Sequence, residues 1–323
     1  MRSLKIYAAG GAGCNLGSSI LKGLKDQQHG LPAIDAVFID TSRSNLNPSI
    51  PSNKTYLFDN LDGSGKLRAS NYQVLNEYSR EILLQHKPGD INIILSSGGG
   101  GSGSVIAPIL TSELLNRGEH VIVITIGSTS SRIETENTLK TLQSYEMISQ
   151  KRNQPVIMAY RENSAERPRS YVDLEVQELV LMLAIIFSGN NRELDMSDLR
   201  NFLNYHKVTS FHPKLSYLGV SSSSIKLDKG QALVSLVTLT DEKTSSEPNV
   251  LAAYQAVGYL PEGTKELIRG DMPLHATVIS GYYNSVVEQL ESKIKSYDDV
   301  RSAVIEKSIV SRGMDTTDDG IVL

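Results

Sequence analysis

Cysteine is nearly missing from this sequence, and its scarcity excludes two kinds of stabilising site. Cys14 is the one cysteine among 323 residues, so no intramolecular disulfide can form, and a reducing cytoplasm is the natural compartment. The six histidines are far apart along the chain and show no ligand spacing. Because a lone cysteine cannot build a thiolate metal site, we expect no structural zinc and no metal held by protein side chains alone.

Long hydrophobic runs are also missing. The most apolar segment, Leu179 to Phe187, has nine residues, about half of what a helix needs to span a bilayer. The apolar run at the amino terminus is too short for a signal peptide, so we expect neither export nor a membrane anchor. With 40% hydrophobic and 21% charged residues, the composition is that of a globular protein, and the chain length allows two domains.

The sequence has no concentrated cluster of basic residues. The net charge is −4 at neutral pH, and lysine and arginine are scattered along the chain. A protein that binds nucleic acid directly usually gathers its positive charge on one face. We therefore expect no direct binding of DNA or RNA.

Four β-rich runs in the first half of the sequence each end in small or polar residues. The runs are LKIYAA, AVFID, INIILS and HVIVITI, and stretches with helical character lie between them at 16–27, 71–85 and 105–117. Alternating strands and helices predict an α/β fold with an open, Rossmann-like parallel sheet that is covered on both faces. In such sheets, ligands bind outside the carboxyl ends of the strands, where these loops would lie.

The second half predicts a different organisation. Apolar residues at helical spacing over 171–187 indicate a long central helix, and a short helix should follow up to 205. Three strand signals and a helix near 250–256 predict a smaller α+β domain, and 285–310 reads as a charged amphipathic helix before an acidic tail. We divide the chain into 1–170, 171–205, 206–283 and 284–323.

The segment SGGGGSG, Ser97 to Gly103, directly follows a predicted strand and precedes a predicted helix. Glycine lets backbone N–H groups approach an oxyanion closely, serine adds hydroxyl donors, and a helix start adds positive potential. Flexible turns also contain glycine, but a glycine loop between a strand and a helix indicates a phosphate site. A second such segment, GGAGCN, follows the first strand. Two such segments on one sheet edge suggest a nucleotide with several phosphates.

Two common nucleotide motifs fit poorly. In GGAGCNLG the third glycine of a dinucleotide fingerprint falls at Gly17, one residue late, which weakens an NAD-dependent oxidoreductase as the alternative function. In DGSGKL, Asn60 stands where a P-loop has its first glycine, and Leu67 stands where serine or threonine holds magnesium. The latter segment can still face a phosphate.

Three motifs together resemble the tubulin/FtsZ superfamily. SGGGGSG is similar to the tubulin signature at every position except Gly100, where the family usually has threonine. GGAGCN resembles the first nucleotide loop of FtsZ, and LDMSDL, Leu194 to Leu199, resembles the loop that contacts the next subunit's nucleotide. The short second domain, the long terminal helix and the acidic tail are most similar to the phage-encoded tubulins.

The resemblance implies a GTP/GDP site, with Mg²⁺ held through the phosphates. Asp173 would accept hydrogen bonds from the guanine base, Asn15 would also contact the base, and Glu134 would meet the ribose hydroxyls. The family often places an aromatic residue at the position of Arg169, and Tyr171 is nearby. The phosphates would be held by Gly10, Gly11, Gly13, Cys14, Gly65, Lys66, Gly98, Gly99, Gly100, Gly101, Ser102 and Gly103.

Asp195 and Asp198 allow two interpretations. Three residues apart at a helix start, they can cap the helix and complement its dipole. Hydrolysis of a γ-phosphate, however, needs a carboxylate to hold the attacking water, and the glycine loops supply none. The resemblance implies that both aspartates act on the neighbouring subunit's GTP, so that hydrolysis requires head-to-tail assembly.

The last residues, MDTTDDGIVL, have two interpretations, a frayed end or a segment that binds the next subunit. The resemblance implies the second, in which Asp315, Asp318 and Asp319 dock on a basic patch of the next subunit and Ile321, Val322 and Leu323 fill a groove. The implied function is a GTPase that forms dynamic filaments in the infected bacterial cytoplasm and positions phage DNA during replication. A nucleotide-binding structural filament without turnover is a further alternative.

Overall fold

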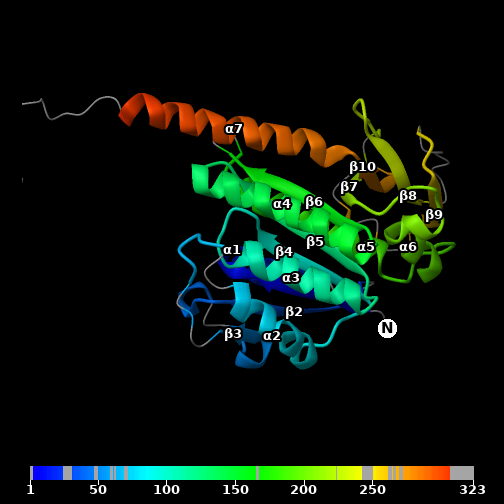
Figure 1. The fold of residues 1–323 in the computed structure, drawn as a ribbon. Helices are drawn as coiled ribbons and strands as arrows, with labels where there is room; N and C mark the ends of the chain where they lie inside the picture. Colours follow the sequence, from blue (N-terminus) through cyan, green and yellow to red (C-terminus); the bar gives the residue numbers. More distant parts are fainter. Residues whose placement is uncertain are drawn as a thin grey trace, which may run out of the picture.

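The computed structural model describes residues 3–24, 31–46, 50–58, 61, 63–68, 72–164, 167–222, 224–241, 250–260, 264, 267–268 and 272–305. Strands and helices alternate through the first half of the chain, as the sequence predicts (Figure 1). The helices are α1 (Gly10–Leu24), α2 (Tyr72–Gln85), α3 (Gly103–Asn116), α4 (Arg132–Arg152), α5 (Arg169–Ile186), α6 (Met196–Leu203) and α7 (Tyr282–Ile305). The strands are β1 (Ser3–Ala9), β2 (Ala33–Asp40), β3 (Thr55–Leu57), β4 (Ile91–Ser97), β5 (Val121–Ser128), β6 (Val156–Asn163), β7 (Leu215–Ser221), β8 (Ala232–Thr240), β9 (Tyr254–Tyr259) and β10 (Leu274–Ser280).

These strands form one sheet, in the order β3-β2-β1-β4-β5-β6-β7-β10-β8-β9. The first seven in this order run parallel, and β10 runs antiparallel to both β7 and β8. Parallel neighbours need long crossover connections, which the helices supply. The predicted α/β class is therefore the observed one, and the strands of the second half extend the sheet of the first half through the β6–β7 pairing. The domain boundaries stay a prediction.

Helices cover both faces of the sheet. The hydrophobic core on one face includes residues of α1, α5 and α6, and the core on the other face includes residues of α2, α3, α4 and α7. Along β1, Ile6 and Ala8 point into the first core and Tyr7 and Ala9 into the second, as the two-residue period of a strand requires. Both faces of the central strands are thus buried, which explains their continuous apolar runs.

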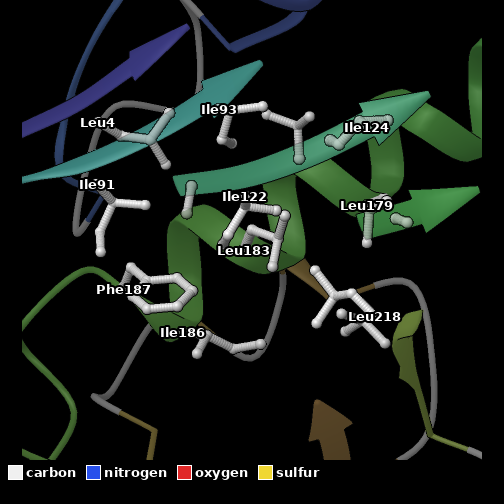
Figure 2. Close-up of a cluster of buried hydrophobic side chains, with 14 of the residues drawn as sticks. Leu4, Ile91, Ile93, Ile122, Ile124, Leu179, Leu183, Ile186, Phe187 and Leu218 are labelled. Carbon is white, nitrogen blue, oxygen red and sulfur yellow. The ribbon is translucent and has the colours of Figure 1, made fainter. Parts of the chain in front are cut away.

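The predicted central helix is α5, and it joins the two halves of the sheet. In Figure 2, Phe187, which lies just after the helix, is near Ile91, whereas Leu183 is near Ile122 and Leu179 is near Ile124. The same cluster includes Leu218 of β7 (Figure 2). Each buried side chain of this kind is worth about 1.5–3 kcal/mol of transfer free energy, so the packing of α5 stabilises strands of both halves.

Two local expectations were wrong. The segment 250–256, expected as a helix, has no helical residue among those described, and from Tyr254 it forms the edge strand β9. Its alanines favour a helix, but pairing with β8 and packing of Tyr254 and Ala256 on the core override that weak preference. The polar segment after β5, expected as a loop, begins α4 at Arg132, where the Ser131 side chain accepts a hydrogen bond from the Glu134 amide.

Candidate functional site

The glycine-rich segments meet at one edge of the sheet. Because β1, β2 and β4 are parallel neighbours, their carboxyl ends lie together, with Ala9 opposite Ile39 on one side and Ser96 on the other. β5 and β6 end on the same edge, with Ser128 opposite Asn163. The segments that follow these strands are therefore neighbours in space, which is where an open α/β sheet binds its ligands.

Gly10 and Gly103 bring two helix starts into contact. A methyl group on Gly10 would lie 2.6 Å from the backbone nitrogen of Gly103, and Gly10 has a φ of +74°, which side chains rarely adopt. The segment GGAGCN was expected as a loop, but α1 begins at Gly10, so Cys14 and Asn15 lie inside the helix. The first N–H groups of a helix have no partner within it, so the starts of α1 and α3 together offer amide donors and positive potential to an anion.

Ser102 links the segments that follow three strands. It precedes α3, and its hydroxyl lies 2.6 Å from the Thr41 hydroxyl after β2 and 3.2 Å from the Ser64 hydroxyl after β3. A methyl group on Gly101 would lie 2.9 Å from Cα of Lys66 and closer still to the Ser64 side chain, whereas one on Gly100 would have no atom within 4 Å. Gly101 is thus required by packing, and Gly100 faces open space.

Lys66 and Glu134 contact each other directly. The Lys66 ammonium lies 2.5 Å from Oε1 of Glu134, and the Ser128 hydroxyl donates to Oε2 at 2.5 Å. Burial acts to raise the pKa of Glu134, but the hydrogen bonds from Lys66 and Ser128 outweigh it and hold that pKa below its ordinary value. Gly65 and Lys66 both have positive φ, which bends this segment towards Ser102. Asn137 donates to the carbonyls of Lys66 and Gly99, which fixes the segment against the glycine loop.

The residues expected at a guanine base lie on two helices that pack against each other. Asp173 is in the second turn of α5 and Asn15 is exposed on α1. Burial raises the pKa of Asp173, opposed by Arg169, whose Nε lies 3.8 Å from the carboxylate. Tyr171 and Leu174 are each 55% exposed on the same stretch of α5.

Asp40 also lies at this edge of the sheet, and the sequence patterns did not single it out. It ends β2, is fully buried, and accepts a hydrogen bond from the Thr41 amide at Oδ1, whereas Oδ2 has no partner among the described residues. Burial raises the pKa of this carboxyl group. The signal was present, because an acid directly after the apolar run AVFI, at a strand end on the ligand edge, is unusual.

Asp195 and Asp198 stand apart from the glycine segments. α6 packs against β8 and β9 (Figure 1), and Asn204 after it contacts His120, which precedes β5 at the amino edge of the sheet. Oδ1 of Asp195 accepts from the Ser197 and Asp198 amides at 2.6 and 3.0 Å, and Asp198 accepts from the Asp195 amide at 3.1 Å. The two aspartates thus form a reciprocal capping box, as the first of the two interpretations expects.

The described residues contain no helix that could cross a membrane and no cluster of three or more histidine, cysteine or acidic side chains that could hold a metal. The predicted tail contacts lie outside the described residues.

Comparison with known proteins shows which family the chain resembles. A phage tubulin-like protein of Pseudomonas phage phiKZ is 31% identical over 215 residues, which is 63% of each chain, and that of Pseudomonas phage PhiPA3 is 29% identical over 68% of this chain and 67% of the relative. A protofilament structure of TubZ from bacteriophage PhiKZ has a TM-score of 0.82 at 25% identity, covering 99% of both chains. The chain is thus similar, in sequence and in fold, to phage proteins of the tubulin/FtsZ superfamily. A GDP structure of the phage tubulin PhuZ superposes on this tubulin-like chain with a TM-score of 0.85 at 19% identity, again covering 99% of both chains. No protein-family model matches it. The alignment with the phiKZ relative spans less than two thirds of that relative's length.

Proposed function

We propose that this tubulin-like chain is a GTPase that assembles head to tail into dynamic filaments and hydrolyses GTP at the interfaces between subunits. The observation that carries the proposal is the convergence of the α1 and α3 starts at Gly10 and Gly103, which leaves backbone donors and no side-chain bulk. The names of two relatives support it, since one is a TubZ protofilament and the other a PhuZ–GDP structure. We further propose that the filaments position phage DNA in the host cytoplasm.

The base, ribose and phosphates would each meet a different group of residues. The Asp173 carboxylate suits the two N–H donors of guanine, which adenine does not present in that arrangement, and the Asn15 amide can both donate and accept. Glu134 would receive the ribose hydroxyls, and Lys66 would bring a positive charge to the γ-phosphate. Both functions require the Lys66–Glu134 ion pair to break, since the Lys66 ammonium now binds the Glu134 carboxylate.

Mg²⁺ fits the oxygen atoms at this edge. Among the described residues, Oδ2 of Asp40 is a buried carboxylate oxygen without a partner. Thr41 follows Asp40 in the sequence, and its hydroxyl lies 2.6 Å from the Ser102 hydroxyl. Mg²⁺ prefers one or two carboxylates together with water and phosphate oxygens. When bound, it would neutralise charge on the phosphates, a contribution that the missing threonine at Gly100 makes more important.

Asp195 and Asp198 would orient the attacking water on the GTP of an adjoining subunit. They lie towards the amino edge of the sheet and the glycine segments lie at the carboxyl edge, so a head-to-tail contact could join them into one site. The capping box, however, gives both aspartates a structural role. That observation favours, as a second candidate, a filament that binds nucleotide without turning it over.

Light scattering and phosphate release distinguish these functions. We expect assembly with GTP and with a slowly hydrolysed GTP analogue, no assembly with GDP, and phosphate release with GTP in proportion to polymer. Removal of residues 314–323 should raise the concentration needed for assembly, because the acidic tail would clasp the next subunit. Assembly that is indifferent to nucleotide would contradict the main proposal, and assembly without phosphate release would favour the structural filament.

A further inference from the structure

Tyr254 joins the edge strand β9 to the acidic helix start. Its hydroxyl donates a hydrogen bond to Oδ1 of Asp198 over 3.0 Å, and the side chain of Asn201 also hydrogen-bonds to Tyr254. Because the Asp195 amide already occupies Oδ2 of Asp198, the two oxygens of this carboxylate are each held by a donor. Tyr254, a residue outside α6, therefore helps to fix the orientation of the Asp198 carboxylate.

β9 also holds the segment that leads into α6. The amide of Arg192 donates to the Tyr259 carbonyl at 3.0 Å and the amide of Tyr259 donates to the Arg192 carbonyl at 2.9 Å. A methyl group on Gly258 would lie 2.6 Å from Cβ of Leu194, so β9 and this segment are in close contact. The strand thus anchors the segment before the capping box and, through Tyr254, the capping box itself.

We infer that Tyr254 is a positioning residue for GTP hydrolysis, which acts in trans by fixing the Asp198 carboxylate that orients the attacking water on the neighbouring subunit's nucleotide. The inference rests on the proposed function, since it gives Asp198 the catalytic role described above. A carboxylate that only caps a helix needs no hydrogen bond to the oxygen outside the cap, which in Asp198 is Oδ1. A carboxylate that orients an attacking water needs a fixed direction, because small displacements of a reacting group reduce rates strongly.

The inference is tested with Tyr254→Phe, which removes the hydroxyl and keeps the ring that packs on the core. Tyr259→Phe is the matched control, since it removes a hydroxyl from the same strand and retains the backbone pairing with Arg192 and the guanidinium over the ring. Critical concentration and GTP turnover per polymerised subunit are measured for both, and thermal melting shows whether they fold.

Tyr254→Phe should fold, assemble at a critical concentration within about twofold of wild type, and lose about tenfold in turnover, the effect of about 1.4 kcal/mol on a barrier. Tyr259→Phe should match wild type in both. In the Asp198→Ala background, Tyr254→Phe should cause no further loss of turnover, because the two residues act through one group.

Three outcomes would overturn the inference. If Asp198→Ala lowers turnover and Tyr254→Phe does not, the proposed function stands and the role of Tyr254 is refuted. If Tyr254→Phe raises the critical concentration while turnover per polymerised subunit is unchanged, the tyrosine serves assembly alone. If Asp198→Ala turns over GTP at the wild-type rate, both the catalytic proposal and this inference fail.

Discussion

The ammonium of Lys66 lies 2.5 Å from Oε1 of Glu134, so the segment after β3 is tied to the start of α4 across the candidate nucleotide site. The family resemblance implies different roles for these two residues, Lys66 at the γ-phosphate and Glu134 at the ribose. Because the two residues are in contact, nucleotide binding would replace the Lys66–Glu134 ion pair with two new interactions, one for each residue. Since Lys66 is 52% exposed, the pair itself contributes little stability, under about 1 kcal/mol, and would not impede such an exchange.

The Lys66–Glu134 pair predicts a small dependence of stability on pH. Because the folded-state pKa of Glu134 is lowered, its contribution is fully present above the unfolded-state value of about 4.3 and is lost as pH falls through the folded-state pKa. Denaturant melts of wild type and Glu134→Gln should therefore differ at pH 7 and converge at an acidic pH below the folded-state pKa of Glu134. The isosteric glutamine keeps the packing of the side chain. An equal difference at both pH values would show that charge plays no part.

Gly100 and Gly101 should respond in opposite ways to a side chain. We expect Gly100→Thr to leave the free energy of unfolding within about 0.5 kcal/mol of wild type, since open space surrounds the site. Gly101→Ala should cost about 1–3 kcal/mol, because the methyl group meets the backbone of Lys66. Chemical denaturation measures both. If Gly100→Thr also raises the affinity for GTP, the family's threonine supplies a hydroxyl that this chain lacks, and Gly100→Ala serves as the control.

The two roles of Asp195 can be separated by substitution. Asparagine caps a helix about as well as aspartate, so Asp195→Asn should keep the stability of α6, whereas Asp195→Ala should lose about 0.5–2 kcal/mol. If the carboxylate acts on GTP, both variants should lose turnover in assembled filaments. Wild-type turnover in the stable Asp195→Asn protein would leave only the capping role.

Asp40 predicts how nucleotide binding depends on Mg²⁺. Its folded-state pKa is raised by burial, so the stability it contributes is complete below the unfolded-state value and is lost as pH rises through the folded-state pKa. A cation bound at Oδ2 would favour the ionised form of this carboxyl group and offset the cost of its burial. Calorimetric titration should show that Mg²⁺ strengthens GTP binding to wild type about tenfold more than to Asp40→Asn. Asp35→Asn, in the same strand but paired with Lys5 and Lys54, is the control and should behave as wild type.

Helix α7 should loosen when its contact with the segment after β5 is removed. The Tyr297 hydroxyl donates to the Thr129 carbonyl at 2.6 Å, and Arg132 pairs with Asp298 one residue later. We expect Tyr297→Phe to speed the hydrogen exchange of amides over 293–302. Ser302→Ala is the control, because that hydroxyl bonds only within the helix. Unchanged exchange in Tyr297→Phe would show that Arg132 and Asp298 suffice.

Local residue patterns predicted most of the fold. Continuous apolar runs ending in glycine or serine gave the central parallel strands, because a strand buried on both faces must be apolar throughout. The residue patterns predicted neither β6 nor α4. In α4, many polar residues obscure the spacing of apolar residues that is typical of a helix. β9 was read as a helix because edge-strand pairing depends on a partner far away in the sequence.

The sequence by itself determined the α/β class, the two glycine segments and the pair of aspartates, since strand period, missing side chains and capping patterns are properties of neighbouring residues. Only the tertiary structure decided that Asp40 is buried with a partnerless oxygen, that Lys66 and Glu134 meet, and that Tyr254 holds Asp198. Each of these depends on strand order, which brings together residues from distant parts of the chain and fixes which of their groups water can reach.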